Sequence, residues 1–168
     1  MTKVILVQGD ITTQRVDAIV NSANSSLLGG GGVDRAIHKA AGPKLLEECK
    51  KLDGCRTGEA KISKGYSLPV KYIIHTVGPV YGQENGAEST LLAKCYISSL
   101  MLAKKFDIKT IAFPSISTGV YGYPKEEAVK IAYKTIVNFI KNDNSFTEVR
   151  FVLHSIEDYQ LYSTYWIK

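Results

Sequence analysis

The chain has 168 residues, a length that supports one ordinary domain and is too short for two hydrophobic cores of normal size. Apolar residues make up 45% of it and charged residues 22%, which is typical of folded globular proteins and excludes a disordered or collagen-like chain. The 21 basic and 16 acidic residues give a net charge of +5, but the basic residues are scattered, so no nucleic-acid groove is predicted. We expect one globular domain over residues 1–168.

Neither a membrane segment nor a metal site is expected. No apolar run approaches the roughly 20 residues of a membrane-spanning helix, and no signal peptide is visible. Cys49, Cys55 and Cys95 lack a Cys-x-x-Cys spacing, which fits reduced thiols better than disulfides or zinc ligands. A cytoplasmic protein without bound metal follows as the expectation.

Apolar runs and helical patterns alternate along the chain. β-Branched runs at 4–7, 18–20, 72–74, 110–113 and 149–153 predict strands buried on both faces. Apolar residues at helical spacing predict helices over 33–41, 92–106 and 128–140. This alternation indicates a layered α/β fold, and the continuously apolar strands favour a largely parallel or mixed sheet covered on both sides.

Two glycine-containing loops follow predicted strands. Gly29 to Gly32 lead into the first helix, where a flexible backbone and free helix amides suit a phosphate, although a plain surface turn is the alternative. Residues 114–124 combine hydroxyls with glycines beyond another strand and before a helix. The two loops together suggest a diphosphate ligand. No Gly-Lys-Ser/Thr or Gly-x-Gly-x-x-Gly motif is present, which disfavours kinases, GTPases and dehydrogenases.

Polar residues gather at the same predicted strand ends. Asp10 follows the first strand, Asn21 and Asn24 follow the second, and Asp34 lies at the start of the first helix. Each has a structural alternative, because Asp34 could cap free helix amides and Asn24 could stabilise a turn. Their convergence on one face favours a binding or catalytic site.

The histidines carry weaker signals. His38 lies four residues after Asp34 and could share its helix face, but a surface or packing role is the simpler interpretation than a catalytic base. His75 ends a buried run and is expected to be a hydrogen-bonded core residue.

Four motifs occur in a fixed order: QGDIT at 8–12, NSAN at 21–24, GGGGVD at 29–34 and STGVYG at 117–122. Together with IHTVGP at 74–79 they resemble the macrodomain family, and within it the MacroD-type branch, over essentially the whole chain. The resemblance implies a three-layer α/β/α sandwich around a mixed sheet, with an ADP-ribose cleft at the strand ends.

The resemblance also implies roles for individual residues. Asp10 should bond the adenine amino group and Ile11 should line the adenine pocket, where family members often place an aromatic residue and this chain has His154. Asn24 and Asp34 fall beside the distal ribose; we expect Asn24 to orient it and Asp34 to position or deprotonate water. The remaining expected contacts are the glycine-loop residues Gly30, Gly31, Gly32 and Val33, and the diphosphate cradle Ser117, Thr118, Gly119, Val120 and Tyr121.

MacroD-type proteins are similar in removing ADP-ribose from acidic side chains and in deacetylating O-acetyl-ADP-ribose, and we expect the same activities here. The expected partners are ADP-ribose and ADP-ribosylated proteins, with no cofactor, nucleic acid or membrane and with a monomeric chain. Two alternatives stay open: a non-catalytic ADP-ribose reader, and a phosphatase acting on ADP-ribose 1″-phosphate. Arg35 could contact protein substrates, but facing water is the simpler expectation.

Overall fold

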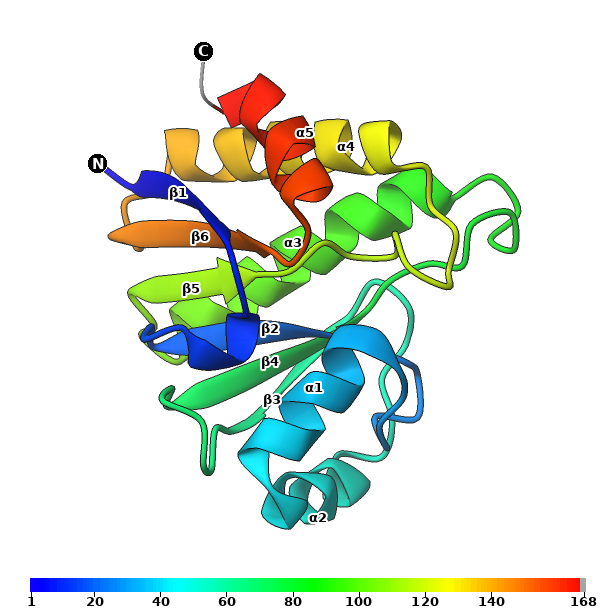
Figure 1. Cartoon of the computed structure of the whole chain (residues 1–168), viewed down its shortest axis with the longest axis vertical. Coiled ribbons are helices and arrows are strands. Elements are labelled where there is room, and N and C mark those ends of the chain that lie inside the picture. The colour runs from blue at the N-terminus through cyan, green and yellow to red at the C-terminus, as the bar shows by residue number, and fades with distance from the viewer. Residues whose placement is uncertain (167–168) are drawn as a thin grey trace.

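The computed structural model describes residues 1–166 and contains one six-stranded sheet in the order β1-β6-β5-β2-β4-β3 (Figure 1). Neighbouring strands are parallel except β3 and β4, which pair antiparallel. The strands are β1 (Lys3–Gln8), β2 (Ala18–Ala23), β3 (Ala60–Lys64), β4 (Tyr72–Val77), β5 (Thr110–Phe113) and β6 (Glu148–Leu153).

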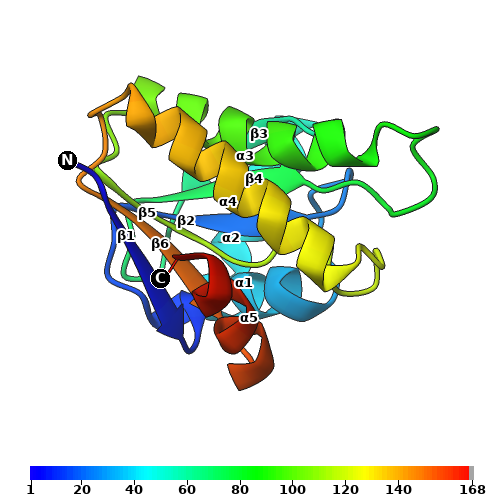
Figure 2. The same cartoon turned by 90° about the horizontal axis from the view of Figure 1, so that it is seen from above.

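Helices cover both faces of this sheet (Figure 2). The helices α3 and α4 pack on one face and α1 and α2 on the other, while α5 packs against α4, β1 and β6. The bounds are α1 (Gly32–Ala41), α2 (Pro43–Leu52), α3 (Glu88–Lys105), α4 (Lys125–Lys141), α5 (Ile156–Trp166) and a short 3₁₀ helix at Ile11–Thr13. The predicted three-layer α/β/α fold with a mixed, largely parallel sheet is therefore confirmed.

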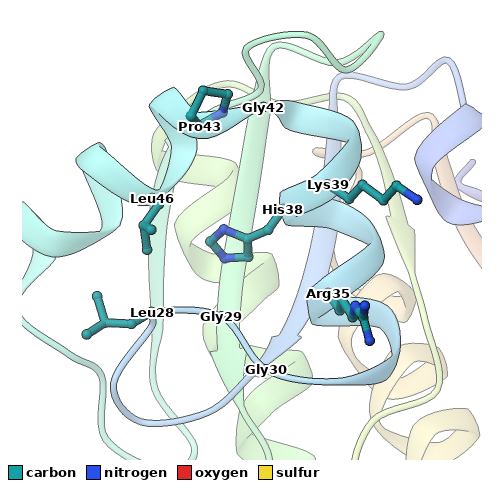
Figure 3. Close-up of a pocket in the computed structure, with 9 residues that line it drawn as sticks. All are labelled: Leu28, Gly29, Gly30, Arg35, His38, Lys39, Gly42, Pro43 and Leu46. Atoms are coloured by element: carbon teal, nitrogen blue, oxygen red, sulfur yellow. The ribbon is translucent and has the colours of Figure 1, made fainter.

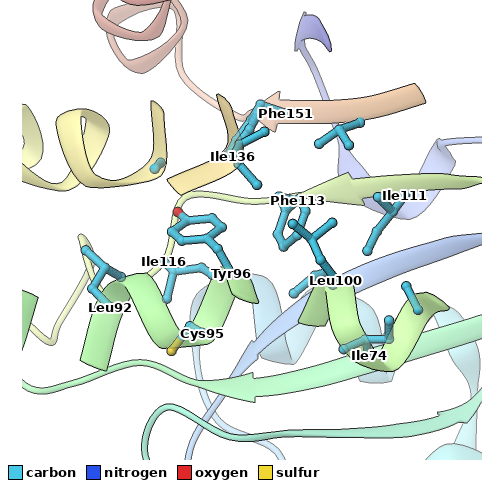
Figure 4. Close-up of a cluster of buried hydrophobic side chains, with 14 of the residues drawn as sticks. Ile74, Leu92, Cys95, Tyr96, Leu100, Ile111, Phe113, Ile116, Ile136 and Phe151 are labelled. Atoms are coloured by element: carbon cyan, nitrogen blue, oxygen red, sulfur yellow. The ribbon is translucent and has the colours of Figure 1, made fainter. Parts of the chain in front are cut away.

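Each layer boundary holds its own apolar cluster. Alternate residues of one strand point to opposite faces, so Phe151 of β6 packs with Tyr96 and Phe113 toward α3 and α4 (Figure 4), whereas its neighbour Val152 joins the cluster under α1 and α2. Burial on both faces explains why the strands read as continuous apolar runs.

The five predicted strands and three predicted helices are present. Besides the short 3₁₀ helix, three elements were not predicted. The strand β3 (AKISK) lies at the sheet edge with most of its residues only partly buried, so it lacks the apolar signal of a central strand. The helix α2 begins directly at Pro43 after Gly42, too close to α1 to be separated by pattern alone, and the helix α5 carries a weak apolar periodicity.

The parallel strands place all their carboxyl ends at one edge of the sheet, where the loops containing the sequence motifs emerge. The candidate residues therefore meet at this edge. Within residues 1–166, the longest helices fall short of the length and apolarity that crossing a bilayer requires.

Candidate functional site

Two adjoining hollows form a cleft at this edge of the sheet. One has a volume of about 450 Å³ and is lined by Asp10, Ile11 and His154, among others. The other has a volume of about 320 Å³ and is lined by Asn24, Asp34 and Tyr121, among others. Both hollows are bounded by Gly32, Val33, Ser115 and Gly119, so the start of α1 and the 114–124 loop form the waist of one continuous cleft.

At the first end of the cleft, Asp10 caps the 3₁₀ helix. Its Oδ1 accepts hydrogen bonds from the Thr12 backbone N–H at 2.8 Å and the Thr12 hydroxyl at 2.7 Å. These bonds stabilise the carboxylate and lower the pKa of Asp10 below its ordinary value. The side chain is thereby held in place, and in the described part of the chain its Oδ2 has no hydrogen-bond partner, so it can accept one from a ligand.

The waist combines helix amides with a strained serine. The first N–H groups of α1, from Gly32 onward, have no acceptor within the helix and suit an anion. Across the cleft Ser117 has a positive φ of 66°, which is unusual for a residue with a side chain, and its buried Oγ has no hydrogen-bond partner. A Cβ atom at Gly78 would collide with that Oγ, so glycine at this position makes room for Ser117.

The rest of the 114–124 loop forms a turn over the cleft. The Tyr123 N–H donates to the Ser117 carbonyl at 2.9 Å, and the Tyr121 carbonyl accepts from the Tyr81 N–H at 2.8 Å. These bonds place Tyr121 in the cleft wall, while the side chain of Val120 is fully exposed at the rim.

At the second end of the cleft, Asn24 organises the glycine loop. Its Oδ1 accepts from the Ser26 N–H at 3.1 Å and from the Ser26 hydroxyl at 2.6 Å, and its Nδ2 donates to the Gly29 carbonyl at 2.9 Å. Three of its four side-chain hydrogen-bonding capacities are therefore used within the loop, and one N–H remains for a ligand. The turn-stabilising interpretation of Asn24 is thus realised in the structure, alongside its position in the cleft.

Asp34 does not cap its own helix. Its carboxylate is buried, with 3% exposure, and its Oδ1 accepts from Nδ2 of Asn21 at 2.9 Å. Nε2 of His38, one turn along α1, lies 3.3 Å from the same oxygen without the alignment of a hydrogen bond. Asn21 and His38 thus both face the inner oxygen of Asp34. His38 shares the helix face of Asp34, as its spacing of four residues allowed, although a surface or packing role was the simpler expectation.

Buried side chains of β3 and β4 support Asn21 from behind. Its Nδ2 also lies 3.1 Å from Nδ1 of His75, the residue opposite it in the register of β2 and β4. Because that amide nitrogen can only donate, Nδ1 of His75 accepts, and Nε2 carries the proton toward Oγ of Ser63 at 2.9 Å. Burial, with a smaller contribution from His38, lowers the pKa of His75 to about 4, so the ring stays neutral. His75 is the hydrogen-bonded core residue that the sequence predicted.

Unpaired polar atoms concentrate at this end of the cleft. Among the described residues, six buried side-chain atoms lack a partner, and four of them belong to Asn21, Asp34, His38 and Ser117. A methyl group at Gly30 would stand 3.1 Å from Oδ2 of Asp34 and 3.2 Å from Nδ2 of Asn24. The free carboxylate oxygen and the Asn24 amide therefore both pack against Gly30, at a distance that leaves little room for a side chain there.

The cleft brings together the residues that the sequence nominated, with Asp10, Ile11 and His154 at one end and Asn24 and Asp34 at the other. Ser115 of the predicted 114–124 loop also lies in the wall, as does Asp158, which sequence reasoning left out. The His75 and Ser63 contacts had no sequence signal, because their partners are distant along the chain. Within residues 1–166, no three His, Cys, Asp or Glu side chains are arranged to hold a metal ion.

Comparison with known proteins agrees with this geometry. Residues 20–132 match the Macro domain family. A macro domain-containing protein of Chlorobaculum tepidum is 56% identical over 156 residues, covering 93% of this chain and 91% of the relative. The human ADP-ribose glycohydrolase MACROD2 is 54% identical over 162 residues, which cover 95% of this chain but 38% of that longer protein. The chain belongs to the macro domain family.

Solved structures show the same relationship. The Oceanobacillus iheyensis macrodomain with ADP superimposes with a TM-score of 0.93 at 47% identity, covering 96% of this chain and 88% of that one. The Trypanosoma brucei macrodomain in complex with ADP-ribose gives a TM-score of 0.91 at 44% identity, covering 96% and 68%.

Proposed function

We propose that this chain, acting as a single macro domain over residues 1–168 without a cofactor, binds ADP-ribose and hydrolyses the ester that links it to acidic side chains of mono-ADP-ribosylated proteins. The same chemistry would remove the acetyl group of O-acetyl-ADP-ribose, which is also an ester on the distal ribose. The carrying observation is the buried carboxylate of Asp34 in the wall of the cleft, whose Oδ2 has no partner among the described residues and lies close to Gly30 and Asn24. Relatives named ADP-ribose glycohydrolase and neighbours solved with ADP or ADP-ribose support this assignment.

The cleft suggests how the ligand lies. Adenine would occupy the end with Ile11 and His154, where the free oxygen of Asp10 can accept from the exocyclic amino group. The diphosphate would cross the waist between the α1 amides and the loop from Ser117 through Thr118, Gly119 and Val120 to Tyr121. The distal ribose would then reach the glycine loop at Gly30, Gly31, Gly32 and Val33.

Hydrolysis at this position needs a placed water and a group to receive its proton. Oδ2 of Asp34 is free to accept that proton while Asn21 holds Oδ1, so the carboxylate is oriented before substrate binds. The water oxygen bonds to the ester carbonyl carbon while its proton passes to Oδ2 of Asp34. The bond from that carbon to the ribose oxygen then breaks, and Asp34 returns the proton to the departing ribose oxygen. The products are the side chain as a carboxylic acid and free ADP-ribose. The remaining N–H of Asn24 can orient the ribose.

One observation favours a second function. Because Asn24 uses most of its hydrogen-bonding capacity on the glycine loop, its presence is also compatible with a reader that binds ADP-ribose without cleaving it. A catalytic role and a structural role for Asn24 must therefore be separated by measuring binding and turnover together.

The test is the time course of ADP-ribose release from a protein modified on Glu or Asp, with ADP-ribose affinity and thermal stability measured on the same samples. Wild type should release ADP-ribose, and both Asn24→Ala and Asp34→Ala should release it much more slowly. Asp34→Asn should keep the affinity while losing turnover, and full turnover in this variant would exclude Asp34 as the proton acceptor. Binding by wild type without release would assign a reader, or a hydrolase for another linkage such as the 1″-phosphate.

A further inference from the structure

A third hollow lies beside the glycine loop, between the 28–30 segment, α1 and the start of α2 (Figure 3). It has a volume of about 480 Å³ and is separate from the adenine end of the cleft. The residues that line it are Leu28, Gly29, Gly30, Arg35, His38, Lys39, Gly42, Pro43 and Leu46. We call it the Arg35 hollow.

The Arg35 hollow combines an apolar wall with positive charge. Leu28, 49% exposed, and Leu46 lie on one side, and the exposed Arg35 lies on the turn of α1 next to the glycine loop (Figure 3). Lys39 also borders the hollow but extends away from it in this view. Of the described residues that form its walls, none is an Asp or Glu, in contrast to the adenine end, which contains Asp10 and Asp158.

The Arg35 hollow adjoins the end of the cleft where the reacting bond would lie. Gly30 borders both the Arg35 hollow and the part of the cleft that contains Asn24 and Asp34. His38 connects the same two regions, because its ring points into the hollow while its Nε2 lies 3.3 Å from Oδ1 of Asp34 (Figure 3). A modified side chain held at the Asp34 end continues into a polypeptide, and the Arg35 hollow is the adjoining space.

We propose that the Arg35 hollow binds the segment of the ADP-ribosylated protein that flanks the modified Asp or Glu, and that it selects segments carrying further acidic residues. This inference rests on the proposed function and adds a substrate preference to it. Arg35 would pair with a flanking carboxylate, while Leu28, Pro43 and Leu46 would contact the aliphatic part of the segment. ADP-ribose alone would not reach this hollow.

The experiment compares two peptides of equal length, each carrying one ADP-ribose on a central residue through a linkage that resists hydrolysis. One has Glu and Leu as flanking residues and the other has Lys and Leu. Wild type should bind the acidic peptide about twofold to fivefold more tightly at low salt, the range for an exposed ion pair. The ratio should approach one at about 1 M salt, where the screening length is only about 3 Å.

Two charge-reversal variants provide the matched comparison. Arg35→Glu should abolish or invert the preference, and Arg35→Gln should reduce it. Lys130→Glu reverses another exposed cation, on α4 at the other face of the sheet, and should keep the preference. The affinity for ADP-ribose alone, measured for every variant, corrects for any change that Arg35→Glu causes in the cleft itself.

The outcomes separate this inference from the proposed function. Equal affinity of wild type for the two peptides, or an unchanged preference in Arg35→Glu, would overturn the selection of acidic segments even where ester cleavage is observed. A preference that depends on Arg35, without cleavage of the corresponding esters, would support the Arg35 hollow and refute the hydrolase assignment. Failure of wild type to bind ADP-ribose at all would overturn both.

Discussion

The buried His75 makes the stability of this protein depend on pH in a defined window. Its pKa lies near 4 in the folded chain, against an ordinary value of 6.5, chiefly because burial disfavours the charged ring. Between these values the unfolded chain binds a proton that the folded chain does not. The contribution of His75 to the free energy of unfolding should therefore be fully present above pH 6.5 and should decrease as the pH falls to about 4. Below that pH, His75 should cause no further loss of stability.

The size of this effect follows from the two pKa values. Their difference corresponds to about 3 kcal/mol of stability lost across the window, a large part of the roughly 5–15 kcal/mol of a typical domain. Asp143, whose pKa is lowered to about 2 chiefly by its hydrogen bond from Lys104, acts at lower pH and does not interfere. In the folded chain His75 is protonated only near and below pH 4, so the acceptor that it offers Asn21 is kept across this window.

The assay is urea denaturation at closely spaced pH values from 7 to 4 for wild type and His75→Gln. The variant should be less stable at pH 7, because it loses buried contacts, but its stability should fall less steeply on acidification. Between pH 7 and 4, the difference between the free energies of unfolding of wild type and His75→Gln should shrink by a large fraction of about 3 kcal/mol. A constant difference between them from pH 7 to 4 would refute the assignment of a low pKa to His75.

Two further predictions concern the cleft. Gly30→Ala should slow ester hydrolysis at least tenfold relative to wild type, because its methyl group would stand 3.1 Å from Oδ2 of Asp34 and 3.2 Å from Nδ2 of Asn24 and would displace them. Initial rates measured beside ADP-ribose affinity would test this, and a rate equal to that of wild type would contradict it. His154→Ala should weaken ADP-ribose binding about twofold to tenfold through lost stacking on adenine, as measured by calorimetry. An unchanged affinity would place adenine elsewhere.

Local chemistry in the sequence was sufficient to predict most of the framework. Apolar runs buried on both faces identified the five parallel strands, and the glycine run before Val33 identified the start of α1. The edge strand β3 was not predicted, because a strand paired on one side only is partly exposed and has no continuous apolar run. The motif order also sufficed to recognise the family, since it extends over most of the chain.

Only the tertiary structure decided what each candidate side chain does. Asn21 could have bonded many partners, but the parallel register of β2 and β4 sets it opposite His75, and the packing of α1 brings Asp34 to its other side. Likewise, the spacing of four residues allowed His38 to meet Asp34, but the structure alone shows its Nε2 3.3 Å from Oδ1 of that residue. Hydrogen-bond partners and burial depend on contacts between segments far apart in the chain. The sequence therefore determined which chemical groups are available, and the tertiary structure determined which of them meet.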